Sequence, residues 1–350
     1  MYKRLSILTF ALLALAGCIK NNPVSPEEIP MLFSAVASHS TKGIIATTNY
    51  PVDVPFEVQA VYYPHPGSRE GSYTFIEQQK VTFDSGYGNW KTGSDYFWPE
   101  RGKLHFYAGS PAVPALTVSA DHGVQADWQI ESDEQAHTDL CFAEATEECA
   151  NHSIAVPVVF SHALSQVCFK ARPLKNYSFS NSVGQMVQAN VISVVLDSVK
   201  VRGIVSRGHF TQNPLGWTNL SPATTDYKIF GAREGEEGLE LGCDRYENPV
   251  LTTFCTMLLI PQTISEEAEL EEWHHMKIRS SITDPATGEI VSDIRYTIPY
   301  SSRLPLSKCC SRWALDYKYT FRLALGMEDS ELVAAVTDWT ETKEIILGDE

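Results

Sequence analysis

The chain has 350 residues, of which 43% are hydrophobic and 20% charged, and its formal net charge is −16 at pH 7. These values are typical of a globular protein long enough for two domains, and they confine disorder to short segments. The acidic balance argues against nucleic acids as partners and against docking of a polybasic patch on anionic lipid.

The N-terminus has the layout of a lipoprotein leader. Lys3 and Arg4 precede an apolar stretch, Leu5–Leu15, which is too short to span a bilayer that needs about 20 apolar residues. The sequence Leu-Ala-Gly-Cys that follows is a lipobox pattern, in which the thiol of Cys18 takes a diacylglycerol. We therefore expect a signal peptide over residues 1–17 and lipid anchoring at the outer membrane through Cys18. The alternatives are an ordinary secretory signal with an incidental cysteine and a buried apolar N-terminus.

A tether and a first strand are expected after the leader. Residues 18–30 are polar and include three prolines, which favour an extended and solvated spacer. The apolar run Met31–Ala37 then predicts the first strand. The next segment is polar and contains Lys42.

Most of the remaining chain shows strand patterns. Apolar side chains alternate with polar ones over residues 56–62, and residues 189–205 form the longest β-branched run. Residues 317–325 place large apolar side chains on one face and predict a central strand. Turn residues at 284–288 predict a hairpin between two strands. Only Ser265–His275, which opens with Ser-Glu-Glu, is expected to form a helix.

These patterns predict an all-β fold made of antiparallel β-sandwiches. We place the division between an N-terminal domain, residues 31–155, and a C-terminal domain, residues 156–350, just before Val156.

The cysteines leave two possibilities open. Lipidation of Cys18 leaves seven of the eight cysteines, so at least one is unpaired within a monomer. Cys141 and Cys149 could close a small loop as a disulfide in an oxidising compartment. Buried free thiols are the alternative.

Residue patterns of enzymes and metal sites are weak. No Gly-x-Ser-x-Gly, phosphate-loop or dinucleotide motif occurs, so we expect no catalytic residues, no cofactor and no metal. His274 and His275 follow Glu271 and Glu272, but adjacent side chains point apart, which favours a solvated polar segment over a metal site. His162 is expected to pack or to hydrogen-bond at a strand junction rather than to act as a base.

Several short motifs together resemble the fimbrillin family, the lipoprotein subunits of type V pili in Bacteroidales. Their order and spacing across nearly the whole chain carry the resemblance. The motifs are Thr41-Lys42-Gly43, Tyr96-Phe97-Trp98-Pro99 followed by Leu104–Ala108, Asp139–Ala143, Val158–Ser165, Leu258–Gln262, Trp313 before Tyr317–Phe321, and Val336–Trp339.

The resemblance implies two tandem transthyretin-like β-sandwich domains, lipoprotein export and assembly into cell-surface fimbriae through exchange of β-strands. The usual processing position carries Lys42 instead of an arginine, and no acidic run follows Cys18, so a periplasm-facing location also stays open. A cut after Lys42 would release the anchor together with Met31–Ala37. The C-terminal segments Leu332–Val336 and Glu344–Leu347 are the candidate donor strands for a neighbouring subunit.

The expected function is therefore that of a structural, non-enzymatic fimbrial subunit or adhesin. Its expected partners are other fimbrillin subunits, the outer membrane and a host protein or glycan. One alternative is a surface glycan-binding lipoprotein, which would need an exposed row of tryptophans such as Trp90, Trp98, Trp128 or Trp217. Another is a secreted hydrolase with a pair of carboxylates in a cleft.

Overall fold

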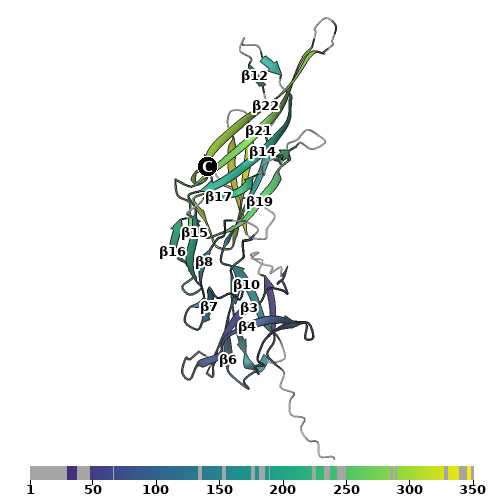
Figure 1. Cartoon of the computed structure of the whole chain (residues 1–350). Coiled ribbons are helices and arrows are strands. Elements are labelled where there is room, and N and C mark those ends of the chain that lie inside the picture. The colour runs from purple at the N-terminus through teal and green to yellow at the C-terminus, as the bar shows by residue number, and fades with distance from the viewer. Residues whose placement is uncertain are drawn as a thin grey trace, which may run out of the picture.

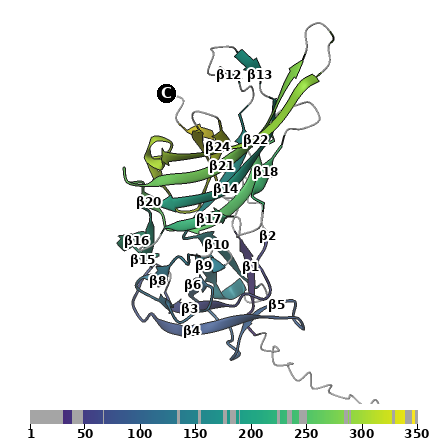
Figure 2. The same cartoon turned by 45° about the horizontal axis from the view of Figure 1, so that its top comes forward.

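The computed structural model (Figures 1 and 2) describes a chain built of β-strands. The described residues are 30–37, 48–65, 67–132, 136–151, 155–174, 178–180, 186–188, 190–222, 226–231, 237–242, 250–283, 287, 290–326, 330–338 and 345–347. Cys18 and Lys42 lie outside them. Within these ranges there is no α-helix, and no helix long and apolar enough to cross a membrane. The prediction of an all-β fold is confirmed.

An eight-stranded sheet closes on itself at the N-terminal end of the molecule, shown in purple and blue in Figure 1. Its order is β10-β9-β6-β3-β4-β5-β1-β2, and a further pairing of β1 with β10 closes it into a barrel. The strands are β1 (Phe33–Ala37), β2 (Thr48–Asn49), β3 (Phe56–Tyr63), β4 (Tyr73–Asp84), β5 (Asn89–Thr92), β6 (Lys103–Ser110), β9 (Cys141–Glu148) and β10 (Val156–His162).

The barrel forms where the sequence alternates. In β3, Phe56, Val58 and Ala60 are fully buried, as the period of two predicts. The core inside the barrel is rich in aromatic side chains, which pack edge to face or tilted: Phe33, Tyr50, Phe56, Trp90, Phe106 and Phe160.

Two further sheets face each other across a second core. One has the order β19-β11-β24-β25-β26, and the other has the order β17-β14-β21-β22 with β18 paired to β14. Their strands are β11 (Ser165–Pro173), β14 (Asn190–Arg202), β17 (Tyr227–Gly231), β18 (Leu239–Leu241), β19 (Thr252–Leu259), β21 (Glu269–Thr283), β22 (Ile290–Pro305), β24 (Tyr317–Leu325), β25 (Glu331–Asp338) and β26 (Ile345–Leu347).

Smaller elements complete the chain. A four-stranded sheet joins β7 (Leu116–Ser119), β8 (Gly123–Gln129), β15 (Val205–Thr211) and β16 (Gly216–Pro222). Two-stranded pairs are formed by β12 (Ser178–Ser180) with β13 (Met186–Gln188) and by β20 (Gln262–Thr263) with β23 (Arg312–Trp313). Short 3₁₀ turns are η2 (Cys149–Asn151) and η3 (Leu306–Lys308).

Strand pairings cross the predicted domain boundary in both directions. β10 begins at Val156 but belongs to the barrel, where it pairs with β1 and β9. The β7–β8 hairpin comes before the boundary, yet its apolar side chains join the second core and β8 pairs with β15. The division just before Val156 stays a prediction.

Two predicted strand features are confirmed. β24 is the middle strand of its sheet, and its Phe321 stacks on Phe169 of β11 with ring centroids 5.5 Å apart. β21 and β22 pair as a long antiparallel hairpin on either side of the predicted turn.

The predicted helix over Ser265–His275 is wrong, because β21 begins at Glu269. Leu270, Glu272, His274 and Met276 all point into the protein, which is the period of a strand. Charged residues at the start of the segment resemble a helix N-terminus, but pairing with β14 and β22 overrides that local signal.

His274 is also not part of a solvated segment, so that expectation is wrong. Its ring is buried, Nδ1 lies 2.8 Å from Oε2 of the buried Glu272, and Nε2 lies 3.2 Å from the carbonyl oxygen of Gly326. Ser330 donates a hydrogen bond to the other Glu272 oxygen at 2.8 Å. His275 points to the opposite face and contacts Asp197 instead, as expected for adjacent residues.

The described cysteines are free thiols, namely Cys141, Cys149, Cys168, Cys255, Cys309 and Cys310. The disulfide between Cys141 and Cys149 therefore does not form in this structure, and the alternative of buried thiols holds for both residues.

Candidate functional site

The strand β1 closes the barrel by lying between two strands that are distant from it in the sequence. It runs parallel to β10, with Phe33 opposite Val156 and Ala37 opposite Phe160. On its other side Phe33 pairs with Trp90 of β5, and β2 adds two antiparallel pairs. Removing β1 would therefore leave the edges of β10 and β5 without a partner between them.

Backbone hydrogen bonds fix the start of this strand. The Met31 N–H donates to the Tyr96 carbonyl oxygen at 2.7 Å, and the Val156 N–H donates to the Leu32 carbonyl oxygen at 2.8 Å. Such bonds depend little on side-chain identity, so another extended segment could make the same contacts.

Side chains of β1 and of the residues just before it fill the bottom of this position. Met31, before β1, is 2% exposed and Phe33 is 0% exposed, whereas Ser34, between the buried Phe33 and Ala35, faces solvent. The Phe33 ring lies 5.9 Å from Phe106 and 6.4 Å from Phe56, both edge to face. Without β1 the position would be an apolar slot bounded by two strand edges, which we call the β1 slot.

The two predicted donor segments differ in their surroundings. β25 contains Leu332–Val336 and lies between β24 and β26, with Ala334 and Ala335 buried. This segment completes its own sheet, and Val333, at 38% exposed, points outward. β26 is a short edge strand that pairs only with β25, through Ile345, Ile346 and Leu347. Within the described part of the chain, β26 is therefore the one of the two segments that lies at a sheet edge.

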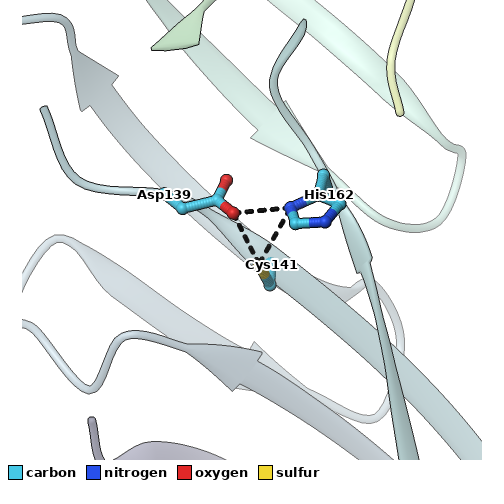
Figure 3. A group of neighbouring side chains, drawn as sticks. All are labelled: Asp139, Cys141 and His162. Atoms are coloured by element: carbon cyan, nitrogen blue, oxygen red, sulfur yellow. Dashed lines mark hydrogen bonds and ion pairs between the residues drawn. The ribbon is translucent and has the colours of Figure 1, made fainter. Parts of the chain in front are cut away.

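Three side chains of different chemistry meet where the chain leaves the barrel (Figure 3). Asp139 precedes β9, Cys141 opens β9, and His162 ends β10 directly opposite Cys141 in the strand register. Asp139 Oδ2 lies 2.5 Å from His162 Nδ1 and accepts a hydrogen bond from the Cys141 thiol at 3.3 Å. Cys141 Sγ lies 3.7 Å from His162 Nδ1. We call these three residues the Asp139–Cys141–His162 cluster.

The electrostatics of this cluster oppose a nucleophilic role for the thiol. Burial raises the pKa of Cys141 well above its ordinary value, and the charge of Asp139 raises it further. Burial lowers the pKa of His162, but the hydrogen bond and charge of Asp139 and the charge of Asp316 outweigh it, so the net shift is upward. A thiol with a raised pKa is a poor nucleophile at neutral pH.

The geometry of the cluster also differs from that of a catalytic triad. In a triad the carboxylate and the nucleophile contact opposite ring nitrogens of the histidine. Here the Asp139 carboxylate and the Cys141 thiol both face Nδ1 of His162. His162 is a hydrogen-bonded residue at a strand junction, as the sequence predicts.

The contacts of Asp139 and Cys141 with His162 were not predicted from the sequence. The spacing of Asp139 and Cys141 could have indicated that they lie together, since residues two apart on an extended segment face the same side. The register that brings His162 opposite Cys141 is not visible in the sequence.

The tryptophans proposed for sugar stacking belong to the cores or their margins. Trp90 and Trp128 are buried, and Trp98 packs against the aromatic core of the barrel. Trp217 is partly buried, and its Nε1 donates to the Ala163 carbonyl oxygen at 2.8 Å. These four residues therefore do not form the exposed row that a glycan-binding surface would need.

Known structures share this fold. A candidate cell adhesion protein of Bacteroides uniformis aligns with a TM-score of 0.50 at 12% identity, covering 90% of this chain and 100% of its own. A candidate cell adhesion protein of Bacteroides ovatus aligns with a TM-score of 0.52 at 12% identity, covering 90% of this chain and 99% of its own. No curated protein matches the chain at a significant level.

The sequence model of the fimbrillin-like family matches residues 55–339, which include the barrel strands from β3 onward and all but the last strand of the second core. The chain belongs to the fimbrillin-like family.

Proposed function

We propose that this protein is a non-enzymatic structural subunit of a cell-surface fimbria and that it joins its neighbours by exchange of β-strands. The observation that carries the proposal is the position of β1. It fills an apolar slot between β10 and β5, which are both distant from it in the sequence. The next strand along the chain, β2, pairs with β1 at two positions. A strand edge next to an apolar groove is a strong template for an incoming strand.

Loss of β1 would create the acceptor site. In this proposal a protease cuts after Lys42 and releases the N-terminal lipid anchor together with β1. The vacated β1 slot then exposes Phe56 and Phe106, and covering such side chains again is worth about 1.5–3 kcal/mol for each. That free energy favours insertion of a strand from another subunit.

The donor would be the C-terminal strand β26 of a neighbouring subunit. Its detachment would leave the sheet intact up to β25, since β26 contributes only the last edge. Release of Leu332–Val336 would instead break five of the eight pairs that join β25 to β24. The donor role therefore falls to residues 344–347 alone.

Export and anchoring complete the proposal. Lipidation of Cys18 would hold the precursor at the outer membrane, and the two cores would correspond to two tandem transthyretin-like domains that divide near Val156. A host protein or glycan would be the target of adhesion. Metabolic labelling with a fatty-acid analogue tests the anchor: the wild type should be labelled and Cys18→Ala should not, and equal labelling of both would refute it.

Controlled removal of β1 tests the assembly mechanism. A recognition sequence for a site-specific protease replaces residues 40–45, and the purified chain is cut and followed by size-exclusion chromatography. We expect loss of the β1 fragment and a ladder of oligomers. The same chain ending at residue 343 should be cut equally well but remain monomeric, because it lacks the donor.

Two results would contradict strand exchange. One is that the cut chain keeps its β1 fragment and stays monomeric, although the cut Phe33→Ala variant releases the fragment under the same conditions. The other is a ladder that forms equally in the chain ending at residue 343. The cleavage position is tested by digesting the unmodified chain and the Lys42→Ala variant with trypsin in parallel. Only the unmodified chain should lose the segment that ends at residue 42.

A further inference from the structure

We propose that the Asp139–Cys141–His162 cluster is a binding site for a transition-metal ion of the zinc type. The three residues offer one carboxylate oxygen, one sulfur and one ring nitrogen, and these atoms all lie within 4.8 Å of one another (Figure 3). Zinc is bound in proteins by these three ligand types, and a thiolate with an imidazole selects it over magnesium or calcium.

The separations between the ligand atoms are close to those around a tetrahedral metal. Bonds of 2.0–2.3 Å from zinc to oxygen, nitrogen and sulfur place neighbouring ligand atoms about 3.3–3.6 Å apart. Cys141 Sγ lies 3.3 Å from Asp139 Oδ2 and 3.7 Å from His162 Nδ1. Only the oxygen and nitrogen, now hydrogen-bonded at 2.5 Å, must separate, by roughly 0.8 Å to reach the tetrahedral distance.

An unsatisfied atom points to a missing partner in the cluster. Asp139 Oδ1 is buried and has no hydrogen-bond partner, although a buried carboxylate oxygen normally has one. A metal ion beside Oδ2, or a water molecule that it holds, would supply that partner. The Asp139 side chain is 30% exposed, so the cluster has a path to solvent for the ion and for a water as fourth ligand.

Binding would exchange protons for the ion. The Cys141 thiol loses its proton to become a thiolate, and His162 binds the ion through Nδ1 with a proton kept on Nε2. At least one proton, that of the thiol, is thus released for each ion bound. Protons compete with the ion for the thiolate and for the ring nitrogen, so affinity should fall as the pH falls.

The location of the cluster gives the ion a structural role. The His162 N–H donates to Asp316 Oδ1 at 3.3 Å, and the Asp316 N–H donates to the Leu164 carbonyl oxygen at 3.1 Å. The chain passes here from β10 of the barrel to β11 of the second core. An ion held by residues 139, 141 and 162 would fix this crossover to the start of β9.

Cobalt titration of the reduced, chelator-treated full chain tests the proposal. A cobalt ion bound to a thiolate gives a ligand-to-metal charge-transfer band in the near ultraviolet. We expect this band to saturate at one equivalent and to disappear when zinc is added. Cys141→Ser should abolish it, and His162→Gln should weaken binding by at least about tenfold, the lower end of what perturbed metal sites show.

Cys168→Ser is the matched control, because Cys168 is also a buried thiol but lies on β11 outside the cluster. It should bind cobalt as the wild type does. Absence of the band in the wild type would overturn the proposal whether or not any variant folds. A band of equal strength in Cys141→Ser would also overturn it, because another thiol would then be the ligand.

Discussion

The barrel strand β1 and the hairpin β21–β22 show two ways of holding a strand in a sheet. β21 and β22 are neighbours in sequence and pair along 15 positions. β1 pairs with β10 along five positions, although Phe33 and Val156 are far apart in the chain. A local hairpin closes a short loop, whereas β1 must be brought to its partner from a distance. The strands of the hairpin are close neighbours in the sequence, whereas β1 keeps its place in the barrel through long-range pairing.

The core of the barrel and the second core also differ in how specific their contacts are. In the barrel, β1 contributes apolar side chains and backbone hydrogen bonds, which another strand could also supply. In the second region, β21 places Glu272 and His274 in a buried network with Ser330. Such polar contacts require particular partners, so they specify one arrangement. The following substitutions test this difference.

The largest loss of stability is expected for Phe321→Ala in the middle strand of the second core. The ring is fully buried and stacks on Phe169, so its removal should lower the free energy of unfolding by about 3–5 kcal/mol. Lys318→Ala on the same strand should change it by less than about 0.5 kcal/mol. Denaturant unfolding measures both, and similar small effects would contradict the central position of β24.

Phe33→Ala should act locally, because Phe33 belongs to the barrel core and not to the second core. Opening of β1 should become easier by about 3 kcal/mol, the lower end for removal of a buried Phe ring. Hydrogen exchange should therefore accelerate in β1 and at the facing edge of β10, but not in β21. The exposed neighbour Ser34→Ala serves as the control. Equal acceleration in β21 would show that β1 does not detach independently.

His274→Gln should reduce the free energy of unfolding by about 2–3 kcal/mol, since it leaves the buried Glu272 with a weaker partner. The adjacent His275→Gln removes a partly exposed contact with Asp197 and should cost less than about 1 kcal/mol. Thermal unfolding of the two variants compares the faces of β21 directly. Equal losses of unfolding free energy in the two variants would show that the buried contact of His274 with Glu272 stabilises the protein no more than the partly exposed contact of His275.

The smallest effect concerns His162 in the chelator-treated protein. Folding raises the pKa of this side chain: burial lowers it, but Asp139 and Asp316 have the larger combined effect. Its stabilising contribution should therefore be complete at pH values below about 6.5 and disappear as the pH rises through the pKa in the folded state.

The difference in melting temperature between the wild type and His162→Gln should accordingly be larger at acidic pH than at alkaline pH. Asp139→Asn should remove most of this pH dependence, because it removes the main charge that favours the protonated ring. An unchanged pH dependence in Asp139→Asn would show that another group is responsible.

The sequence alone determined the features that depend on neighbouring residues. Alternation identified β3 and β24, turn residues identified the hairpin between β21 and β22, and an apolar run identified β1. These patterns are reliable because side-chain period is a local property of an extended chain. Motif order along the chain was also sufficient to indicate the family.

Only the tertiary structure decided which strands lie side by side. β1 could not be placed next to β10, nor Cys141 opposite His162, because pairing between distant strands leaves no periodic signal in either segment. The same limit explains the helix wrongly predicted at Ser265–His275: its charged residues suit a helix end locally, but β14 and β22 provide strand partners on both sides. Pairing over many positions outweighs a local preference worth only a few tenths of a kcal/mol per residue, about the scale of helix propensities.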